Sequence, residues 1–142
     1  MTANLDASAL VATLVNEPGS VAIDAFLDRY DGAIGVSDFA AAEVASGLSR
    51  LVRARLITQP DAEARLSDFD SWRSIGTETI DVDTSDVRLA NTYVRRFELM
   101  LRAPDALHAA ICRRLDLTLV TLDQRLAGAA RELGIDVRVP AG

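Results

Sequence analysis

The stretch from residue 104 to residue 123 reads PDALHAAICRRLDLTLVTLD and joins a helical pattern to a strand pattern. Residues 104–115 predict a helix, because Pro104 can stand in a first helical turn, where its missing N–H is no loss. Residues 117–121 are apolar and β-prone, which favours a short buried strand. Asp123 then stands where an N-cap would precede a helix over 124–133, and Gly134 is placed to end that helix.

Similar units extend toward both ends of the chain. Strand patterns occur at residues 3–6, 33–36, 78–82, 117–121 and 136–139. Helical patterns occur at residues 8–15, 20–30, 38–55, 60–73, 84–98, 104–115 and 124–133. Strands separated by helix-length segments imply right-handed crossovers and a mainly parallel sheet with helices on both faces. We therefore predict one α/β domain over residues 1–142 with a four- or five-stranded sheet.

Composition narrows the classes of function. The net charge is −6, and all fifteen basic residues are arginine. This charge argues against holding nucleic acid by bulk attraction alone and fits a cation binder or a protein with a basic partner. The single cysteine, Cys112, cannot form an internal disulfide or a structural zinc site, and we interpret it as an inert core thiol. No apolar run approaches the roughly 18 residues of a membrane span, and residues 1–6 lack the features of a signal peptide. We expect a cytoplasmic protein without membrane contact.

Four carboxylates stand inside apolar stretches that should pack into the core: Asp6, Glu43, Asp105 and Asp123. A buried or half-buried carboxylate costs several kcal/mol unless it is paired or holds a cation. In alternating α/β proteins the helix N-termini collect at the edge where the strands end, and ligands bind in the crevice there. Asp6 and Asp123 follow strands, while Asp105 and Glu43 lie near the starts of helices. We therefore expect all four acids at this one edge.

Each acid also has a structural interpretation. Asp6, Asp105 and Asp123 can cap helices or interact with the helix dipole, which contributes about 1 kcal/mol. Glu43 lies in the middle of an apolar helical stripe, so its structural alternative is an ion pair with a core arginine. Two carboxylates about 5 Å apart repel by roughly 3 kcal/mol at an effective dielectric of about 20, so a cluster of four needs protons or a divalent cation. Oxygen ligands alone favour Mg²⁺ or Mn²⁺ over zinc.

Five short motifs follow one another along nearly the whole chain. They are LDASAL at 5–10, EPGS at 17–20, EV at 43–44, PDALHAA at 104–110 and VTLD at 120–123. In this order and spacing the chain resembles the PIN-domain ribonucleases, most closely the VapC-type toxins of type II toxin–antitoxin systems. The resemblance implies a three-layer α/β/α fold and Mg²⁺-dependent cleavage of RNA. One departure is Leu126, where many relatives carry an aromatic residue; it affects packing and leaves the acids intact.

The resemblance also implies roles and partners. All four acids would be catalytic, with Asp6 and Asp105 as the principal ligands of Mg²⁺, or of Mn²⁺ as a substitute. Glu43 and Asp123 would complete the acidic metal site, directly or through water. The implied partners are RNA as substrate, a cognate antitoxin protein and a second copy of the chain in a homodimer.

Several polar side chains near the motifs have two interpretations each. His108 can act as a general base, or it can pack or hydrogen-bond so that it orients its helix. Ser8 can bind a metal-bound water or cap the first helix, and Thr121 can contact the scissile phosphate or end a strand. Five scattered arginines can bind RNA phosphates or remain solvated: Arg95, Arg96, Arg102, Arg113 and Arg114.

Other classes of function fit the sequence less well. A phosphoaspartyl hydrolase or receiver domain also places an aspartate after its first strand, but such sites generally use a lysine, which this chain lacks. Ser8 also stands where such a hydrolase has its second aspartate. The missing lysine excludes a P-loop nucleotidase as well. The alternative that stays open is a non-catalytic or RNA-processing PIN-fold protein that works mainly by binding a partner, which the intact set of four acids disfavours.

Overall fold

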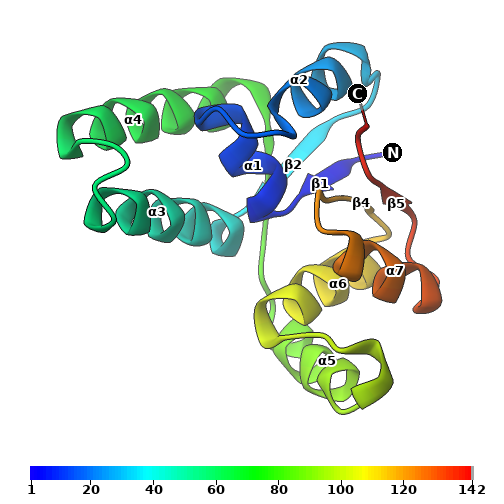
Figure 1. The fold of residues 1–142 in the computed structure, drawn as a ribbon. Helices are drawn as coiled ribbons and strands as arrows, with labels where there is room; N and C mark the ends of the chain where they lie inside the picture. The colour runs from blue at the N-terminus through cyan, green and yellow to red at the C-terminus, as the bar shows by residue number, and fades with distance from the viewer. Residues whose placement is uncertain (142) are drawn as a thin grey trace.

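The computed structural model describes residues 1–141 and contains one parallel β-sheet (Figure 1). Its strands are β1 (Ala3–Leu5), β2 (Ile34–Ser37), β3 (Glu78–Ile80), β4 (Thr118–Val120) and β5 (Val137–Arg138). They are ordered β3-β2-β1-β4-β5, and every neighbouring pair is parallel. Central β1 aligns Ala3 with Ile34 of β2 and with Thr118 of β4. The predicted parallel sheet is confirmed, with five strands.

Helices cover both faces of this sheet. They are α1 (Ala7–Leu14), α2 (Ser20–Arg29), α3 (Asp38–Arg53), α4 (Gln59–Gly76), α5 (Thr84–Val94), α6 (Ala103–Leu115) and α7 (Gln124–Glu132). One apolar cluster contains residues of α1–α4, and a second contains residues of α5–α7. Successive residues of β4 point to opposite faces, so Leu119 belongs to the α5–α7 cluster and Val120 to the α1–α4 cluster. The fold is the expected three-layer α/β/α sandwich.

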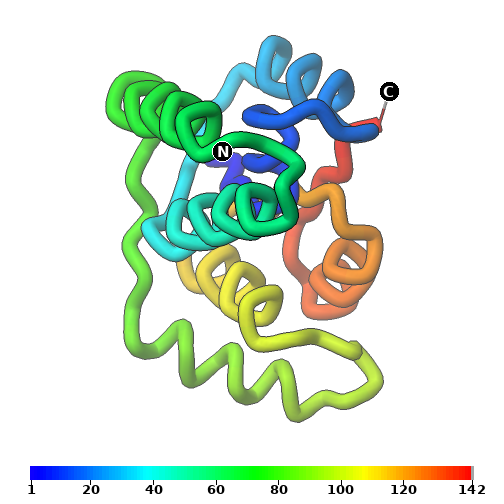
Figure 2. Tube along the Cα trace, turned by 60° about the vertical axis from the view of Figure 1, so that its left-hand side comes forward, coloured from blue at the N-terminus to red at the C-terminus, as the bar shows by residue number. Residues whose placement is uncertain are grey.

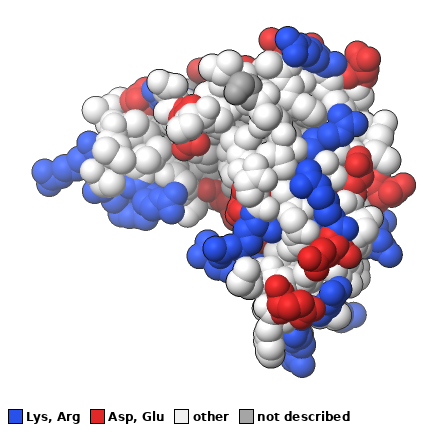
Figure 3. Space-filling model, turned by 45° about the vertical axis from the view of Figure 1, so that its right-hand side comes forward, with Lys and Arg blue, Asp and Glu red and all other residues white. Residues whose placement is uncertain are grey.

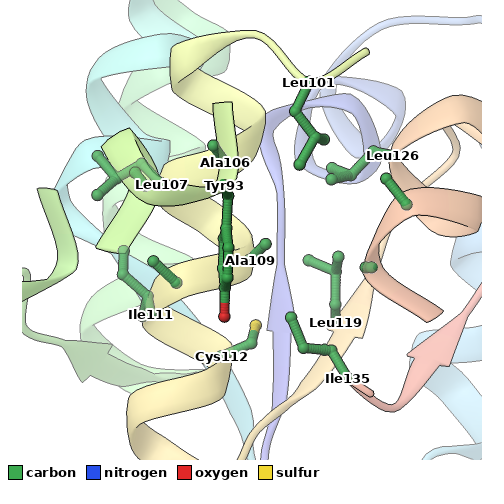
Figure 4. Packing of buried hydrophobic residues seen from close by; sticks show 14 of the residues in the cluster. Tyr93, Leu101, Ala106, Leu107, Ala109, Ile111, Cys112, Leu119, Leu126 and Ile135 are labelled. Atoms are coloured by element: carbon green, nitrogen blue, oxygen red, sulfur yellow. The ribbon is translucent and has the colours of Figure 1, made fainter. Parts of the chain in front are cut away.

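The α5–α7 cluster is the larger of the two and is shown in Figure 4. Ile111 and Cys112 of α6 pack there with Leu119, and each of the three is at most 1 % exposed. Burial raises the pKa of the Cys112 thiol to about 12, so the thiol is neutral at physiological pH. This placement matches the buried core thiol predicted from the sequence.

Helices α3 and α4 form a hairpin that extends away from the sheet (Figures 1 and 2). Ser37 caps α3 by accepting a hydrogen bond from the Ala40 N–H (3.0 Å), and Thr58 caps α4 by accepting one from the Asp61 N–H (3.2 Å). Helix α4 has 18 residues and is strongly polar. Across residues 1–141, no helix combines the length and the apolar composition needed to cross a membrane.

The predicted helix over residues 84–98 is wrong at its C-terminal end. Helix α5 stops earlier, and a short 3-10 helix follows at Phe97–Leu99. The Arg96 N–H donates to the Tyr93 carbonyl oxygen (3.1 Å), which is the i→i−3 bond of a tightened last turn. The turn places Leu99 in the α5–α7 cluster. Burial of this leucine therefore competes with continuation of the helix.

The apolar core predicts a contrast between two isoleucines. Ile111→Ala is expected to lower the free energy of unfolding by about 2–5 kcal/mol, because its side chain is 0 % exposed and its truncation leaves a cavity. Ile75→Ala is the matched control, since Ile75 is 89 % exposed on α4 and should change stability by less than about 0.5 kcal/mol. Urea denaturation measures both values. Equal losses in the two variants would contradict the assigned core.

Candidate active site

The four acids lie at the edge of the sheet where the parallel strands end. Asp6 directly follows β1, and its N–H donates to the Val120 carbonyl oxygen of β4 (3.1 Å). Asp123 lies just beyond β4, at the start of α7. Helices α3 and α6 begin at the same edge, which brings Glu43 into the second turn of α3 and Asp105 into the first turn of α6. The expected shared edge is therefore observed.

The carboxylate of Asp6 is held by three hydrogen bonds. Asp6 is only 4 % exposed. Its Oδ1 accepts from the Ser8 hydroxyl (2.6 Å) and the Ala9 N–H (3.0 Å), and its Oδ2 accepts from the Thr121 hydroxyl (2.5 Å). Burial raises the pKa of Asp6, and the hydrogen bonds from Ser8 and Thr121 partly oppose that rise. Asp6 thus caps α1 and also places a buried carboxyl group at the acidic edge.

Ser8 and Thr121 connect α1 to the loop between β4 and α7. Besides donating to Asp6, the Ser8 hydroxyl accepts from the Leu122 N–H (3.0 Å), and the Thr121 hydroxyl accepts from the Asp123 N–H (3.0 Å). Asp6 and not Ser8 caps α1, and Thr121 directly follows the end of β4. The positioning role that these bonds give both hydroxyls was not anticipated from the sequence. Each fixes both the Asp6 carboxylate and the loop that carries Asp123.

Asp105 makes no capping hydrogen bond within residues 1–141, although it lies in the first turn of α6, where the helix dipole favours an acid. The N-cap of α6 is Arg102, without a side-chain capping bond, so the capping interpretation of Asp105 is wrong. Asp105 is half-buried, and its pKa is raised first by burial and then by the negative charges of Asp123 and Asp6. These charges show that the three aspartates are close enough to destabilise one another when ionised. Asp105 is therefore the acid of the three that experiences this repulsion without making a capping bond.

Asp123 does act as a helix cap. Its Oδ1 accepts hydrogen bonds from the Arg125 N–H (2.9 Å) and the Leu126 N–H (3.3 Å) at the start of α7. For this residue the capping interpretation is confirmed. The same carboxylate also raises the pKa of Asp105, so capping and membership of the acid group coexist in one side chain.

Glu43 pairs with His108, and not with the core arginine considered from the sequence. The Glu43 Oε1 lies 2.5 Å from His108 Nε2, while His108 Nδ1 is buried without a partner within residues 1–141. His108 is 2 % exposed and packs against Phe39, with ring centroids 5.5 Å apart. The expected hydrogen-bonding and packing role of His108 is therefore observed. Glu43 itself lies at the margin of the buried stripe, because its side chain is 27 % exposed toward a groove.

The acids share an edge but do not close around one point. Within residues 1–141, no three His, Cys, Asp or Glu side chains come close enough to hold one metal ion. Glu43 and Asp123 line a groove of about 610 Å³ beside α3, here called the α3 groove. Asp105 and Asp123 line a second groove of about 440 Å³, here called the α7 groove. Glu43 and Asp123 therefore share one groove, Asp105 and Asp123 share the other, and Asp123 lines both. The metal site expected around all four acids stays a prediction.

Three arginines that line these grooves were not found from the sequence. Arg50 and Arg53 line the α3 groove, and Arg125 lines the α7 groove with the already considered Arg102. A signal was present, since residues 50 and 53 follow Glu43 at helical spacing on one face of α3. Arg114, in contrast, donates to both Asp86 carboxylate oxygens at 2.7 and 2.8 Å. This arginine has a structural role, so it is removed from the candidates for phosphate binding.

The sequence matches the PIN domain family over residues 4–132. A search of curated proteins finds no match. Among solved structures, VapBC2 from Rickettsia felis bound to a DNA fragment from their promoter has a TM-score of 0.70 and 20 % identity, covering 97 % of this chain and 98 % of that chain. VapC20 from Mycobacterium tuberculosis, a Sarcin-Ricin loop cleaving toxin, has a TM-score of 0.72 and 16 % identity, covering 89 % of this chain and 94 % of that chain. A toxin–antitoxin complex from Klebsiella pneumoniae has a TM-score of 0.68 and 17 % identity, covering 98 % of both chains.

At these identities the structural likeness establishes the fold. The family match reaches further, because it extends from β1 to the end of α7 and includes all four acids. It also contains the Ser8 and Thr121 hydroxyls that hold Asp6. The chain therefore belongs to the PIN domain family.

Proposed function

We propose that this protein is a Mg²⁺-dependent endoribonuclease that serves as the toxin of a toxin–antitoxin pair. The observation that carries the proposal is the placement of Asp6, Glu43, Asp105 and Asp123 at the edge where the parallel strands end. The pKa of Asp105 there is raised by burial and by the charges of Asp123 and Asp6. Carboxyl groups that repel one another at a ligand-binding edge are stabilised by a cation. Membership of the PIN domain family supports the assignment.

Two structural relatives support the biological role. VapC20 is a toxin that cleaves the Sarcin-Ricin loop, and the Klebsiella pneumoniae structure is a toxin–antitoxin complex. Both share the fold of this chain over most of its length. We transfer from them RNA as the substrate class and an antitoxin as the partner. The homodimer expected from the sequence stays a prediction.

The donor chemistry of the edge fits a hard divalent cation. Asp6, Asp105, Glu43 and Asp123 offer only carboxylate oxygens, which suit Mg²⁺ or Mn²⁺. Asp6 and Asp105 would be the principal ligands, and Glu43 and Asp123 would complete the site directly or through water. Since no three of these groups share a coordination sphere within residues 1–141, at least one side chain has to move toward the others for them to bind the same ion. Such an ion lowers the pKa of a bound water and stabilises charge on a phosphate undergoing in-line displacement.

The surrounding residues of the chain position these acids. Ser8 and Thr121 orient the Asp6 carboxylate from both sides, and their hydrogen bonds favour its ionised form. His108 holds Glu43 from within the core. In the proposed reaction a water attacks the phosphorus as the P–O3′ bond breaks, and O3′ leaves with a proton. The products carry a 5′-phosphate and a 3′-hydroxyl.

Removal of single ligand charges tests the proposed chemistry. Asp6→Asn and Asp105→Asn should each lower RNA cleavage by about 100-fold or more, since losing even an outer-shell partner of a metal costs about 10–100-fold. Asp28→Asn, an exposed aspartate on α2, is the control and should retain activity. The measurement is cleavage of labelled RNA with and without Mg²⁺, with melting curves to confirm folding.

Three results would contradict this assignment. They are full activity in either ligand variant, undiminished wild-type cleavage in excess EDTA, and RNA binding by the wild-type protein without any cleavage in Mg²⁺. The last result would favour the alternative of a PIN-fold protein that works mainly by binding a partner.

The raised pKa of Asp105 predicts a pH-dependent change in stability. An acid with a higher pKa in the folded than in the unfolded protein destabilises the fold where it is ionised. Its penalty is absent below the ordinary pKa of 3.8 and grows as the pH rises through the folded pKa. In EDTA, Asp105→Asn should therefore raise the melting temperature by roughly 1–3 °C at pH 7 and lose this gain as the pH approaches 3.8. Thermal melts of both proteins from pH 4 to 8 measure this difference in melting temperature. A difference that grows toward acid pH would contradict the raised pKa of Asp105.

The acids of this edge form no ion pair with an arginine within residues 1–141, and this predicts the chemistry of the antitoxin. We expect a tight complex in which an antitoxin Arg or Lys enters the edge between Glu43, Asp105 and Asp123 and displaces the metal. Co-expression of the chain with the small gene beside its own, followed by purification, tests for the complex. Recovery of free toxin alone at micromolar concentration would contradict the pairing, and Mg²⁺-dependent cleavage unaffected by added antitoxin would contradict the mode of inhibition.

A further inference from the structure

One face of α3 runs from the acidic edge to a pair of arginines. Glu43, Ser46, Gly47, Arg50 and Arg53 follow one another at intervals of one to four residues, and all five line the α3 groove. This is the spacing of a single helical face. With a rise of about 1.5 Å per residue, Arg50 lies about 10 Å and Arg53 about 15 Å along α3 from Glu43. The groove therefore begins at the acids and ends at two positive charges.

The two arginines of the α3 groove have no ionic partner within residues 1–141. Arg53 donates to the Ser49 hydroxyl (2.6 Å), and no carboxylate of the described chain lies within 4 Å of either guanidinium. Glu17 lines the same groove and is not paired with either of them. Both arginines are exposed and thus free to bind an anion.

A second pair of arginines lies on the other side of the acids. Arg102 and Arg125 line the α7 groove together with Asp105 and Asp123, and neither forms an ion pair within the described chain. Arg102 is near enough to Asp105 to lower its pKa slightly. Asp123 belongs to both grooves, so the acidic edge lies between two basic ends.

These four arginines differ from those that stabilise the fold. Arg65, Arg73, Arg96 and Arg114 are engaged with carboxylates. Figure 3 shows basic side chains gathered at the end of the α3–α4 hairpin and again across the hollow from it, with acidic side chains between. In a chain with a net charge of −6, such local cations are where a polyanion can bind.

We propose that one RNA strand crosses the acidic edge from groove to groove, with its phosphates bound by Arg50 and Arg53 on one side and by Arg102 and Arg125 on the other. This track rests on the proposed nuclease function. The two grooves, of about 610 and 440 Å³, have the size of sites that hold drug-sized ligands, which suits a single strand. Arg50 and Arg53 lie about 10 and 15 Å along α3 from Glu43, so in this track they contact phosphates some nucleotides away from the cut.

The salt dependence of RNA binding tests the track. The probe is a fluorescein-labelled single-stranded RNA of about 16 nucleotides, bound in Mg²⁺ to Asp105→Asn protein so that it stays intact. Arg50→Gln/Arg53→Gln and Arg102→Gln/Arg125→Gln should each weaken binding by about 5- to 30-fold near physiological salt. Each should also reduce the slope of log K against log salt by about 1.4, or about 0.7 for each phosphate that the protein no longer neutralises.

A matched control carries the same change of net charge. Arg88→Gln/Arg131→Gln removes two exposed arginines that line neither groove, and it should leave affinity and slope unchanged. In the otherwise wild-type chain, Arg50→Gln/Arg53→Gln should raise KM for cleavage with little change in kcat, because these two arginines lie about 10–15 Å along α3 from Glu43.

The outcomes separate the track from the nuclease function itself. An unchanged salt slope in either groove variant, with wild-type cleavage intact, overturns the track and leaves the function standing. Equal losses in the control variant also overturn it, since general charge would then explain binding. If the groove variants lose antitoxin binding but still bind RNA like the parent protein, the grooves are assigned to the antitoxin and the track is overturned. A wild-type protein that neither binds nor cleaves RNA overturns both proposals.

Discussion

The buried carboxylate of Asp6 is the constraint on which the site depends. It lies where β1 ends and α1 begins, and it accepts hydrogen bonds from Ser8 and Ala9 of α1 and from Thr121 beyond β4. Burying such a charge costs several kcal/mol, while each hydrogen bond to a charged group contributes about 1.5–3 kcal/mol. The three bonds offset this cost only in part, because the pKa of Asp6 stays raised. The Ser8 and Thr121 hydroxyls also hold the loop that carries Asp123.

The acids show that one side chain can both stabilise the fold and belong to the site. Asp6 and Asp123 both cap helices, and each capping bond contributes about 1 kcal/mol. Asp105 makes no such bond, and its pKa is raised by burial and by the charges of Asp123 and Asp6. Since this electrostatic cost is present without a compensating contact in the fold, Asp105 is the acid whose placement is best explained by a ligand.

The sequence predicts the architecture well because its signals are local. The strand runs, the helix cap at Asp123 and the stop at Gly134, where φ is 80°, depend on neighbouring residues, and the structure has them as expected. The sequence also predicts that the acids lie at one edge, because the order of strands and helices alone determines which of their ends meet. Sequence reasoning failed where the outcome depends on packing between distant elements. The partner of Glu43 is His108, 65 residues away, and no local pattern states that α3 and α6 meet there.

On the α3 side of the edge, the separation between Glu43 and Arg50 resolves a conflict within the proposed function. Carboxylates that hold a cation repel RNA, yet an arginine placed among them would neutralise them, as an inhibitory basic residue from a partner would. Along α3 the chain keeps Arg50 about 10 Å from Glu43, which is close to the Debye length of about 8 Å at physiological ionic strength. At that distance the arginine scarcely shifts the charge of the acids but still binds a phosphate directly. A protein with a negative net charge can thus act on RNA, because binding depends on the charges that line the groove and not on the net charge of the whole protein.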